Sequence, residues 1–272
     1  MPIRVSGVEL LVIKKLLRDM NVDISGYKDD FLSRRIMARM MKLKVNSIAE
    51  YIRILKHSEE ERLNLLNELA INVSCFFRDP PVWQVVKQQV LIPLFKIAAE
   101  SGRTVRIWSA GCAYGQEPYT IAILSMELIK SKFPNLKVII YATDIDEDAL
   151  SIAEKGIYGI SDLKDVPCNL LTKYFNPVGG NLYEIKPYVK QLVRFRRHDL
   201  LKDRPIPLVN AIFCRNVLIY FRKTTRIHVL KKFYESLIRP GFLILGMSES
   251  LPTTLNNMFK PISLKYRIYL KN

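Results

Sequence analysis

The sequence VRIWSAGCAYGQEPYTIAILSMEL, residues 105–128, is the strongest indication of the fold. It begins with a short apolar, β-prone run, continues with small residues and ends at helical spacing, so it predicts a strand, a tight loop and a helix. Gly111 and Gly115 give the loop backbone freedom, and Pro118 suits the first turn of the helix. At the carboxyl end of a buried parallel strand, such a loop binds nucleotide-like ligands, because unpaired helix N–H groups face the ligand.

Two carboxylates accompany this loop. Glu117 lies where the helix begins, where it would repel a pyrophosphate but attract an ammonium or a sulfonium. Asp144 follows the next predicted strand, residues 136–142, and a carboxylate there can accept hydrogen bonds from both hydroxyls of a ribose. The loop has GxxxG spacing and not the dinucleotide pattern GxGxxG, so by itself it does not specify the ligand.

Composition favours a globular protein with one large and one small domain. The 272 residues are 49% hydrophobic, and 42 Lys and Arg against 26 Asp and Glu give a net charge of +16. That charge favours an acidic partner, either nucleic acid, an anionic membrane surface or an acidic protein. No apolar run is long enough to span a membrane, and charges interrupt the apolar pattern at the N-terminus, so we expect a cytoplasmic protein. Scattered cysteines and histidines predict reduced thiols and no metal site.

The first 71 residues predict an all-helical domain. Residues 8–20 and 30–44 carry apolar side chains at helical spacing, and two short helices follow. Capping boxes would open these short helices, Ser47 with Glu50 in one and Ser58 with Glu61 in the other.

A basic stripe lies on the second predicted helix. Arg35, Arg39 and Lys42 are spaced by four and three residues, so they share one helical face. The stripe is either a solvated face or a docking surface for an acidic partner.

Residues 72–81, NVSCFFRDPP, predict the boundary between two domains. Pro80 and Pro81 prevent continuation of the preceding helix, and residues 82–100 predict another helix. Two aromatic residues, an arginine, an asparagine and a hydroxyl are unusual in a solvated tether. We therefore expect Phe76 and Phe77 to fasten the segment to the larger domain, and its polar residues to have a further role.

Alternating strands and helices from residue 105 onward predict an α/β fold with a doubly wound, mostly parallel sheet. Later strands are expected at residues 208–213, 242–245 and 266–270, and helices at 147–155 and 223–238. Residues 157–197 interrupt this order. A helix at 170–175 and a hairpin formed by 182–185 with 191–195 predict a small inserted β-subdomain there.

Four segments together resemble the CheR-type chemotaxis receptor methyltransferases. They are NVSCFFRDP (72–80), WSAGCAYGQEPYTIA (108–122), ATDIDEDALSIAEKGIYG (142–159) and AIFCRNVLIYF (211–221). Their order and separation also match, and the resemblance covers essentially the whole chain. It implies a helical receptor-docking domain (1–71), a linker that contributes to the active site (72–81) and a Rossmann-like S-adenosylmethionine (SAM) domain (82–272), with the β-subdomain at about 157–197.

The resemblance also implies an activity and its residues. The activity is methyl transfer from SAM to glutamate side chains on the cytoplasmic helical domain of methyl-accepting chemoreceptors, which gives methyl esters and S-adenosylhomocysteine. Arg78 and Tyr220 would position the substrate carboxylate as catalytic residues, and Asp199 stands where the family has asparagine. The implied cofactor-binding residues are Asn72, Ser74, Arg78, Glu117, Asp144, Asp199, Leu200, Asn216 and Val217.

The implied chemistry agrees with the residue inventory. A glutamate carboxylate has a pKa of about 4.3, so at neutral pH it is already the nucleophile and needs no general base. Glutamate-rich receptor helices would also suit Arg35, Arg39 and Lys42 as docking residues. Neither a nucleic-acid partner nor membrane insertion is expected.

Two alternatives remain open at this point. A nucleic-acid methyltransferase would use the net charge of +16 and the basic run Arg194, Arg196, Arg197, Lys202 and Arg204. A binding module would hold the cofactor or a receptor without turnover.

Overall fold

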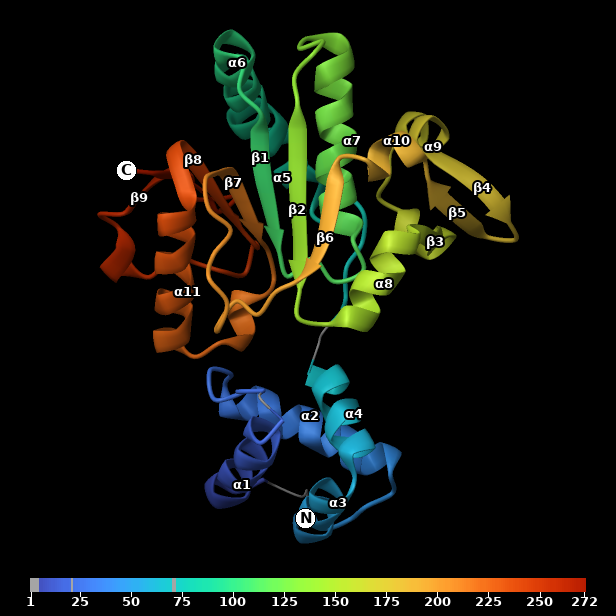
Figure 1. The fold of residues 1–272 in the computed structure, drawn as a ribbon, viewed down its shortest axis with the longest axis vertical. Coiled ribbons are helices and arrows are strands. Elements are labelled where there is room, and N and C mark those ends of the chain that lie inside the picture. The colour runs from blue at the N-terminus through green and yellow to red at the C-terminus, as the bar shows by residue number, and fades with distance from the viewer. Residues whose placement is uncertain (1–4, 21, 70–71) are drawn as a thin grey trace. The chain divides into compact units, whose positions relative to one another are not determined.

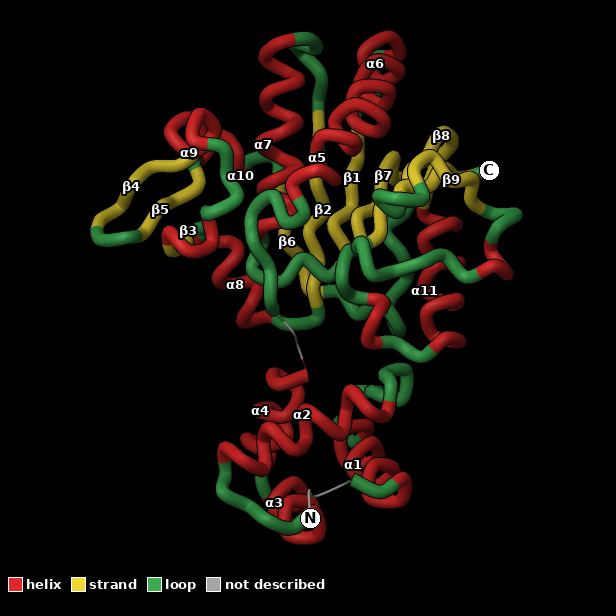
Figure 2. The backbone as a smooth tube through the Cα atoms, turned by 180° about the vertical axis from the view of Figure 1, so that it is seen from behind, coloured by secondary structure: helices red, strands yellow, loops and turns green. Residues whose placement is uncertain are grey.

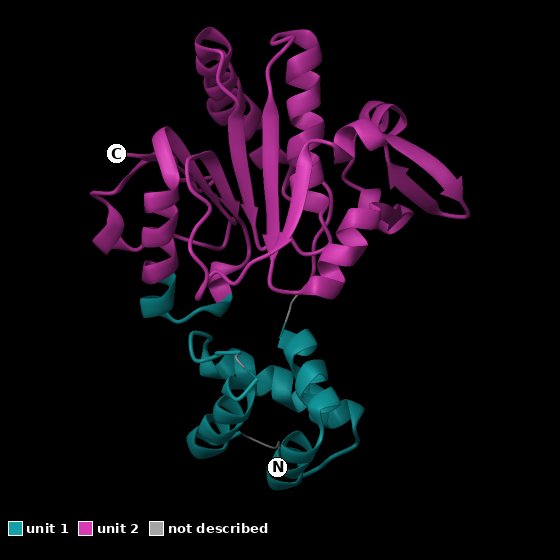
Figure 3. Cartoon of the chain, in the orientation of Figure 1, with its two compact units in different colours: residues 1–71, 220–226 teal, residues 72–219, 227–272 magenta. Residues whose placement is uncertain are grey.

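The computed structural model describes residues 5–20, 22–69 and 72–272 (Figure 1; from behind in Figure 2). The chain forms two compact units, shown in Figure 3. Unit 1 comprises Met1–Ile71 and Tyr220–Arg226, and unit 2 comprises Asn72–Ile219 and Ile227–Asn272. No helix within the described ranges is both long and apolar enough to cross a membrane.

Helices build the described part of unit 1, as the sequence predicts. Their bounds are α1 (Gly7–Arg18), α2 (Asp29–Lys42), α3 (Ile48–His57) and α4 (Glu59–Leu69). Their apolar faces form one core, with Ile13, Leu17, Leu32, Ile36 and Leu65 fully buried.

The segment Tyr220–Arg226 packs with unit 1, although the sequence places it in the methyltransferase domain. The backbone N–H of Lys28 donates to the Tyr220 carbonyl at 3.0 Å, and the Tyr220 ring lies 4.9 Å from the Phe31 ring. Arg222 forms an ion pair with Asp29 at 2.5 Å. These contacts join residues about 190 positions apart, so no local pattern reports them.

The predicted capping boxes need correction. Ser47 makes no side-chain cap hydrogen bond. Ser58 Oγ does accept from the Glu61 N–H at 3.0 Å, but the Glu61 carboxylate binds Arg39 and Tyr51 instead of returning to Ser58. An ion-pair partner from another helix has displaced the local cap.

The basic stripe is mostly paired inside unit 1. Arg39 binds Glu61 through both Nε (3.0 Å) and Nη2 (2.6 Å), and the two side chains are 12% and 5% exposed. Lys42 lies 2.6 Å and Arg35 3.6 Å from the Glu68 carboxylate. The prediction that Arg39 belongs to an accessible basic face is therefore wrong, because its side chain is mostly buried in an ion pair with Glu61. The Lys42 side chain is 60% exposed.

A seven-stranded sheet forms the centre of unit 2, in the order β6-β2-β1-β7-β8-β10-β9. The bounds are β1 (Val105–Ala110), β2 (Val138–Asp144), β6 (Val193–Arg197), β7 (Val209–Cys214), β8 (Leu237–Leu245), β9 (Phe259–Ser263) and β10 (Ile268–Lys271). The five neighbouring strands β6, β2, β1, β7 and β8 are parallel. Strand β10 is antiparallel to both β8 and β9. This confirms the doubly wound, mostly parallel sheet, and adds β9, which the sequence did not indicate.

Helices cover both faces of this sheet. Figure 2 shows α5 (Pro80–Val86), α6 (Ile92–Ser101) and α7 (Gln116–Ser131) over one face. On the other face lies α11 (Lys223–Ser236), whose Phe233 ring is 5.3 Å from the Trp108 ring. A further helix, α8 (Glu147–Lys155), ends at Gly156 in the left-handed conformation, as a glycine C-cap predicts.

The helix expected at residues 82–100 is longer and is interrupted. It begins at Pro80 and passes through the π-helical segment η1 (Lys87–Leu91) into α6. Pro93, the second residue of α6, has no N–H to donate, and a π-helical turn commonly accommodates such a missing hydrogen bond.

The inserted subdomain is a three-stranded antiparallel sheet in the order β3-β5-β4. Its elements are β3 (Ile157–Gly159), η2 (Ile160–Leu163), α9 (Cys168–Tyr174), β4 (Phe175–Gly179), β5 (Leu182–Ile185) and α10 (Pro187–Lys190). The predicted hairpin of 182–185 with 191–195 is wrong. Residues 182–185 pair with β4, and Val193–Arg197 is the edge strand β6 of the large sheet, with Val193 beside Ile140 of β2.

We predict that Arg39→Ala lowers the free energy of unfolding of unit 1 by about 3–5 kcal/mol, because it leaves the buried Glu61 carboxylate without its cation. Lys42→Ala is the matched control and should cost less than about 1 kcal/mol, since its partner contact is exposed. Hydrogen exchange of the α2–α4 amides in the full chain measures both. If both substitutions lowered the free energy of unfolding equally, the Arg39–Glu61 ion pair would stabilise unit 1 no more than an exposed ion pair does.

Candidate active site

The order of the large sheet reverses beside β1, which has β2 on one side and β7 on the other. Open α/β sheets bind ligands in the crevice at the carboxyl ends of the strands next to such a point. The loops that follow β1, β2 and β7 meet at this edge (Figure 1). Each carries residues that the sequence predicts to bind the cofactor.

The loop after β1 packs closely against its neighbours. Gly111 has φ +78°, and a Cβ there would lie 2.5 Å from a Val217 methyl carbon in the loop after β7. The N–H groups of Gly111 and Cys112 both donate to the Thr143 carbonyl, at 2.8 and 2.9 Å. Close approach of two loops therefore requires glycine at position 111.

Glu117 lies in the first turn of α7, with its carboxylate mostly buried. Ser109 Oγ donates to Oε1 at 2.8 Å, and Nη1 of Arg215 lies 3.8 Å from Oε2. Burial raises the pKa of Glu117, whereas the Arg215 charge lowers it. Burial is the largest influence on this acid and no cation of the described residues contacts it closer than 3.8 Å, so a cationic ligand would stabilise its charged form.

Asp144 ends β2 and holds the loop after β1. Its Oδ2 accepts from the Ala113 N–H at 2.8 Å, and its Oδ1 accepts from the Asp146 N–H at 3.1 Å. Burial raises the pKa of this carboxyl group, and these backbone hydrogen bonds oppose the shift. Each oxygen retains a lone pair that can accept from a hydroxyl group.

Asp146 is a residue that the sequence analysis missed. Its Oδ1 caps α8 by accepting from the Ala149 N–H at 3.0 Å, and its Oδ2 accepts from Asn72 Nδ2 at 2.7 Å. It therefore fastens the start of the 72–81 segment to the loop after β2. An aspartate directly before a helical pattern is the signal that could have found it.

A second missed acid, Glu249, organises the loop after β7. Its carboxylate accepts from four backbone N–H groups, those of Asn216 (2.9 Å), Val217 (3.0 Å), Ile219 (3.2 Å) and Gly246 (2.6 Å). Burial raises the pKa of Glu249, and the backbone donors oppose the rise. Glu249 follows a predicted strand at a short distance, as Asp144 does, so the same pattern could have identified it.

Asn216 has an unused acceptor at the site. The residue has φ +62°, and within the described part of the chain its Oδ1 is buried and accepts no hydrogen bond. A buried, unpaired amide oxygen is costly unless a ligand donor reaches it.

The 72–81 segment is part of unit 2, and its aromatic residues fasten it there, as expected. The Phe76 ring lies edge-on to Tyr158 (4.9 Å) and Phe175 (5.2 Å) of the inserted subdomain, and both Phe76 and Phe77 are buried. Arg78 donates from Nη1 to the Val73 carbonyl at 2.9 Å, and its charge is near enough to Glu117 to lower the pKa of that acid. Ser74 is half-buried in the same segment.

Two of the predicted cofactor-binding residues, Asp199 and Leu200, follow β6. The His198 N–H donates to the Asp144 carbonyl at 2.8 Å, which places Asp199 and Leu200 next to the end of β2. Asp199 Oδ1 accepts from the Leu201 N–H at 2.8 Å and so shapes its own turn. Lys232 of α11 donates to the Leu200 carbonyl at 2.9 Å, and burial lowers the pKa of this lysine.

The predicted residues of unit 2 thus gather at one edge of the sheet. Tyr220 differs, because it belongs to unit 1 and packs on Phe31. Its role beside Arg78 stays a prediction.

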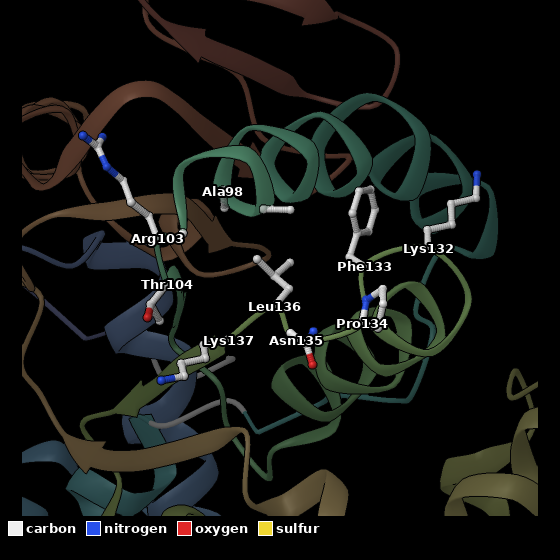
Figure 4. A pocket seen from close by; sticks show the side chains of 11 residues that line it. Ala98, Arg103, Thr104, Lys132, Phe133, Pro134, Asn135, Leu136 and Lys137 are labelled. Carbon is white, nitrogen blue, oxygen red and sulfur yellow. The ribbon is translucent and has the colours of Figure 1, made fainter.

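A cavity of about 440 Å³ lies at the opposite, amino-terminal ends of β1 and β2. Figure 4 shows Phe133 and Leu136 within it, while the charged ends of Arg103, Lys132 and Lys137 point outward. The cavity is remote from the loops described above, and it is not the candidate site. Across residues 5–20, 22–69 and 72–272, no cluster of His, Cys, Asp and Glu could hold a metal ion.

Comparison with known proteins identifies the family. The model described as CheR methyltransferase, SAM binding domain, matches residues 72–268, and the one described as CheR methyltransferase, all-alpha domain, matches residues 11–70. The chain belongs to the CheR methyltransferase family. It is therefore a SAM-dependent methyltransferase of the chemotaxis type, and its cofactor is SAM.

Similar proteins agree with this assignment. A chemotaxis protein methyltransferase of Listeria innocua is 33% identical over 89% of this chain and 92% of its own length. One from Borreliella burgdorferi is 31% identical over 88% of this chain and 87% of its own length. An uncharacterized 104.1 kDa protein of Rhodobacter capsulatus is 34% identical over 91% of this chain, which spans 26% of that protein.

The CheR site fits SAM on its own chemistry. SAM carries an ammonium and a sulfonium, and the site offers the buried acids Glu117 and Asp144 and the unpaired Oδ1 of Asn216. The assignment of single residues to parts of the cofactor stays a prediction.

We predict that Glu117→Gln weakens SAM binding about 10- to 100-fold, since one charge-assisted hydrogen bond is lost. Calorimetric titration measures the affinity, with the exposed Glu100→Gln as control.

The pH dependence of binding should follow from the same residue. Protonation removes the charge of Glu117, and because burial raises its pKa above the ordinary 4.5, wild-type affinity should fall on acidification earlier than for an exposed carboxylate. Glu117→Gln should flatten this dependence. An unchanged pH profile would show that Glu117 does not contact the cofactor.

Proposed function

We propose that this protein methylates glutamate side chains on the cytoplasmic helical domain of methyl-accepting chemoreceptors, giving glutamate methyl esters in chemotaxis adaptation. The names of the relatives, chemotaxis protein methyltransferases, support this substrate class. The protein would act in the cytoplasm, where those domains lie.

The chemistry of the described site carries the proposal. Cys112 and Cys214 are fully buried at the ends of the strands, and burial raises the pKa of both thiols well above the ordinary 9.0. They are therefore protonated and poor nucleophiles. A substrate that is already anionic, such as glutamate, needs no base or thiol, whereas nucleic-acid methylation usually needs one or the other.

When bound, SAM supplies an electrophilic methyl group on a sulfonium sulfur. Glu117, Asp144 and Asn216 would hold the cofactor, and Arg78 would orient the substrate carboxylate through its planar guanidinium fork. Alignment of the two reactants lowers the barrier, because it makes a bimolecular step effectively unimolecular. Too tight an ion pair with Arg78 would weaken the nucleophile, so its role is orientation and not strong binding.

Unit 1 would dock the acidic receptor helices. Lys42 is exposed, although it also contacts Glu68, and Arg35 is partly exposed. Such docking would be electrostatic and would weaken as the salt concentration rises.

The test of the proposed function uses methyl-labelled SAM and a chemoreceptor cytoplasmic fragment, followed by mild alkali. We expect volatile labelled methanol, because carboxyl methyl esters are hydrolysed under these conditions. Alkali-stable label, or label only on added RNA, would contradict the proposal. Cofactor binding without any transfer would indicate a binding module.

We further predict that Arg78→Ala lowers the methyl-transfer rate about 100-fold, because the substrate carboxylate loses its orientation. The rate at saturating SAM measures this, and the exposed Arg103→Ala provides the control. A rate close to that of the wild type would exclude Arg78 from the reaction.

A further inference from the structure

The 72–81 segment adopts a strained backbone next to the site. Phe77 and Asp79 have φ values of +52° and +59°, in the left-handed region that non-glycine residues rarely occupy. Asp79 also precedes Pro80, and steric contact with a following proline favours an extended backbone. Such conformations persist only where surrounding contacts hold them.

One buried side chain, Arg215, contacts both Arg78 and Asp79. Its Nη2 donates to the Arg78 carbonyl at 3.0 Å and to Asp79 Oδ2 at 2.7 Å. Its guanidinium stacks over the Trp83 ring at 5.2 Å, and Trp83 Nε1 donates to the same Arg78 carbonyl at 2.9 Å. The Arg215 side chain is only 2% exposed, so these contacts are shielded from water.

The second terminal nitrogen of the same guanidinium, Nη1, faces the first turn of α7. Nη1 of Arg215 lies 3.8 Å from Oε2 of Glu117, the buried acid in the first turn of α7. One rigid fork therefore connects the acid predicted to hold SAM with the backbone of Arg78. Arg215 directly precedes Asn216, so its position is set by the loop that Glu249 organises.

We propose that Arg215 is a positioning residue, which holds the Arg78 carbonyl and clamps Asp79 in the left-handed conformation, and thereby presents Arg78 to the substrate carboxylate. This inference rests on the proposed function for the identity of the substrate. Arg215 itself does not touch the reacting atoms. Lysine cannot replace it, because an ammonium lacks the planar fork that binds two acceptors and stacks on an indole.

The clamp predicts that methyl transfer and cofactor binding respond differently to substitution. Arg215→Lys keeps a positive charge beside Glu117 but loses the fork. Asp79→Asn removes the ion pair and keeps a residue type that tolerates the left-handed region. At saturating SAM, Arg215→Lys should lower the transfer rate about 100-fold and Asp79→Asn about 10-fold. In both variants the affinity for SAM should stay within about threefold of the wild-type value.

The experiment compares Arg215→Lys, Asp79→Asn, the double variant and the exposed control Arg103→Lys. Transfer to a chemoreceptor fragment is measured at saturating SAM, and SAM affinity is measured by calorimetry. The double variant should be no slower than Arg215→Lys alone, because the two residues act through one contact. The proposal is overturned if Asp79→Asn transfers methyl groups at the wild-type rate, or if the double variant loses rate by the product of the two single losses. It is also overturned if SAM affinity falls in parallel with the transfer rate.

Hydrogen exchange separates this inference from the proposed function. The Phe77 N–H donates to Thr120 Oγ1 at 3.1 Å and the Val82 N–H donates to the Asp79 carbonyl at 2.9 Å, so both amides report on the clamped segment. Their exchange should accelerate in Arg215→Lys and Asp79→Asn and not in Arg103→Lys. If the wild type transfers no methyl group to the receptor fragment, the proposed function fails, and the exchange rates still decide the clamp. If Arg215→Lys does not fold, Asp79→Asn decides it, since the Asp79 side chain is 39% exposed.

Discussion

Buried carboxylates that accept backbone N–H groups hold the site together. Glu249 receives four such donors from the loops after β7 and β8, and Asp144 receives two from the loops after β1 and β2. The loops lie at the carboxyl ends of the strands, where the sheet no longer pairs their N–H groups. Without the carboxylates these N–H groups would lack hydrogen-bond acceptors, and each buried unpaired donor would lower the free energy of unfolding.

The loops that these carboxylates hold provide the surface against which the 72–81 segment packs. Its apolar residue Phe76 enters the core beside the inserted subdomain, and its polar residues meet partners on the loops, Asn72 on Asp146 and Asp79 on Arg215. Burial supplies the stabilisation, and the ion pair selects the backbone conformation. A segment that resembles a linker in position is therefore part of the methyltransferase unit in structure.

The basic stripe of α2 shows how far a local pattern extends. Helical spacing correctly places Arg35, Arg39 and Lys42 on one face. It contains no information about Glu61 and Glu68, which α4 brings to that face and which neutralise most of it. Exposure of charge, and hence its availability to a receptor, depends on packing between helices and not on spacing within one.

Periodicity, glycine positions and strand ends are local signals, so the amino-acid sequence alone predicts the strand-loop-helix at residues 105–128, the mostly parallel sheet, the glycine cap of α8 and the acids Glu117 and Asp144. The pairing of Val193–Arg197 with β2 is visible only in the folded chain, since an alternating run suits more than one sheet. The same holds for the partners of Glu249 and Arg215, which lie 33 and 136 residues away in the chain. Contacts of that separation follow from how the elements pack, and no short stretch of sequence specifies them.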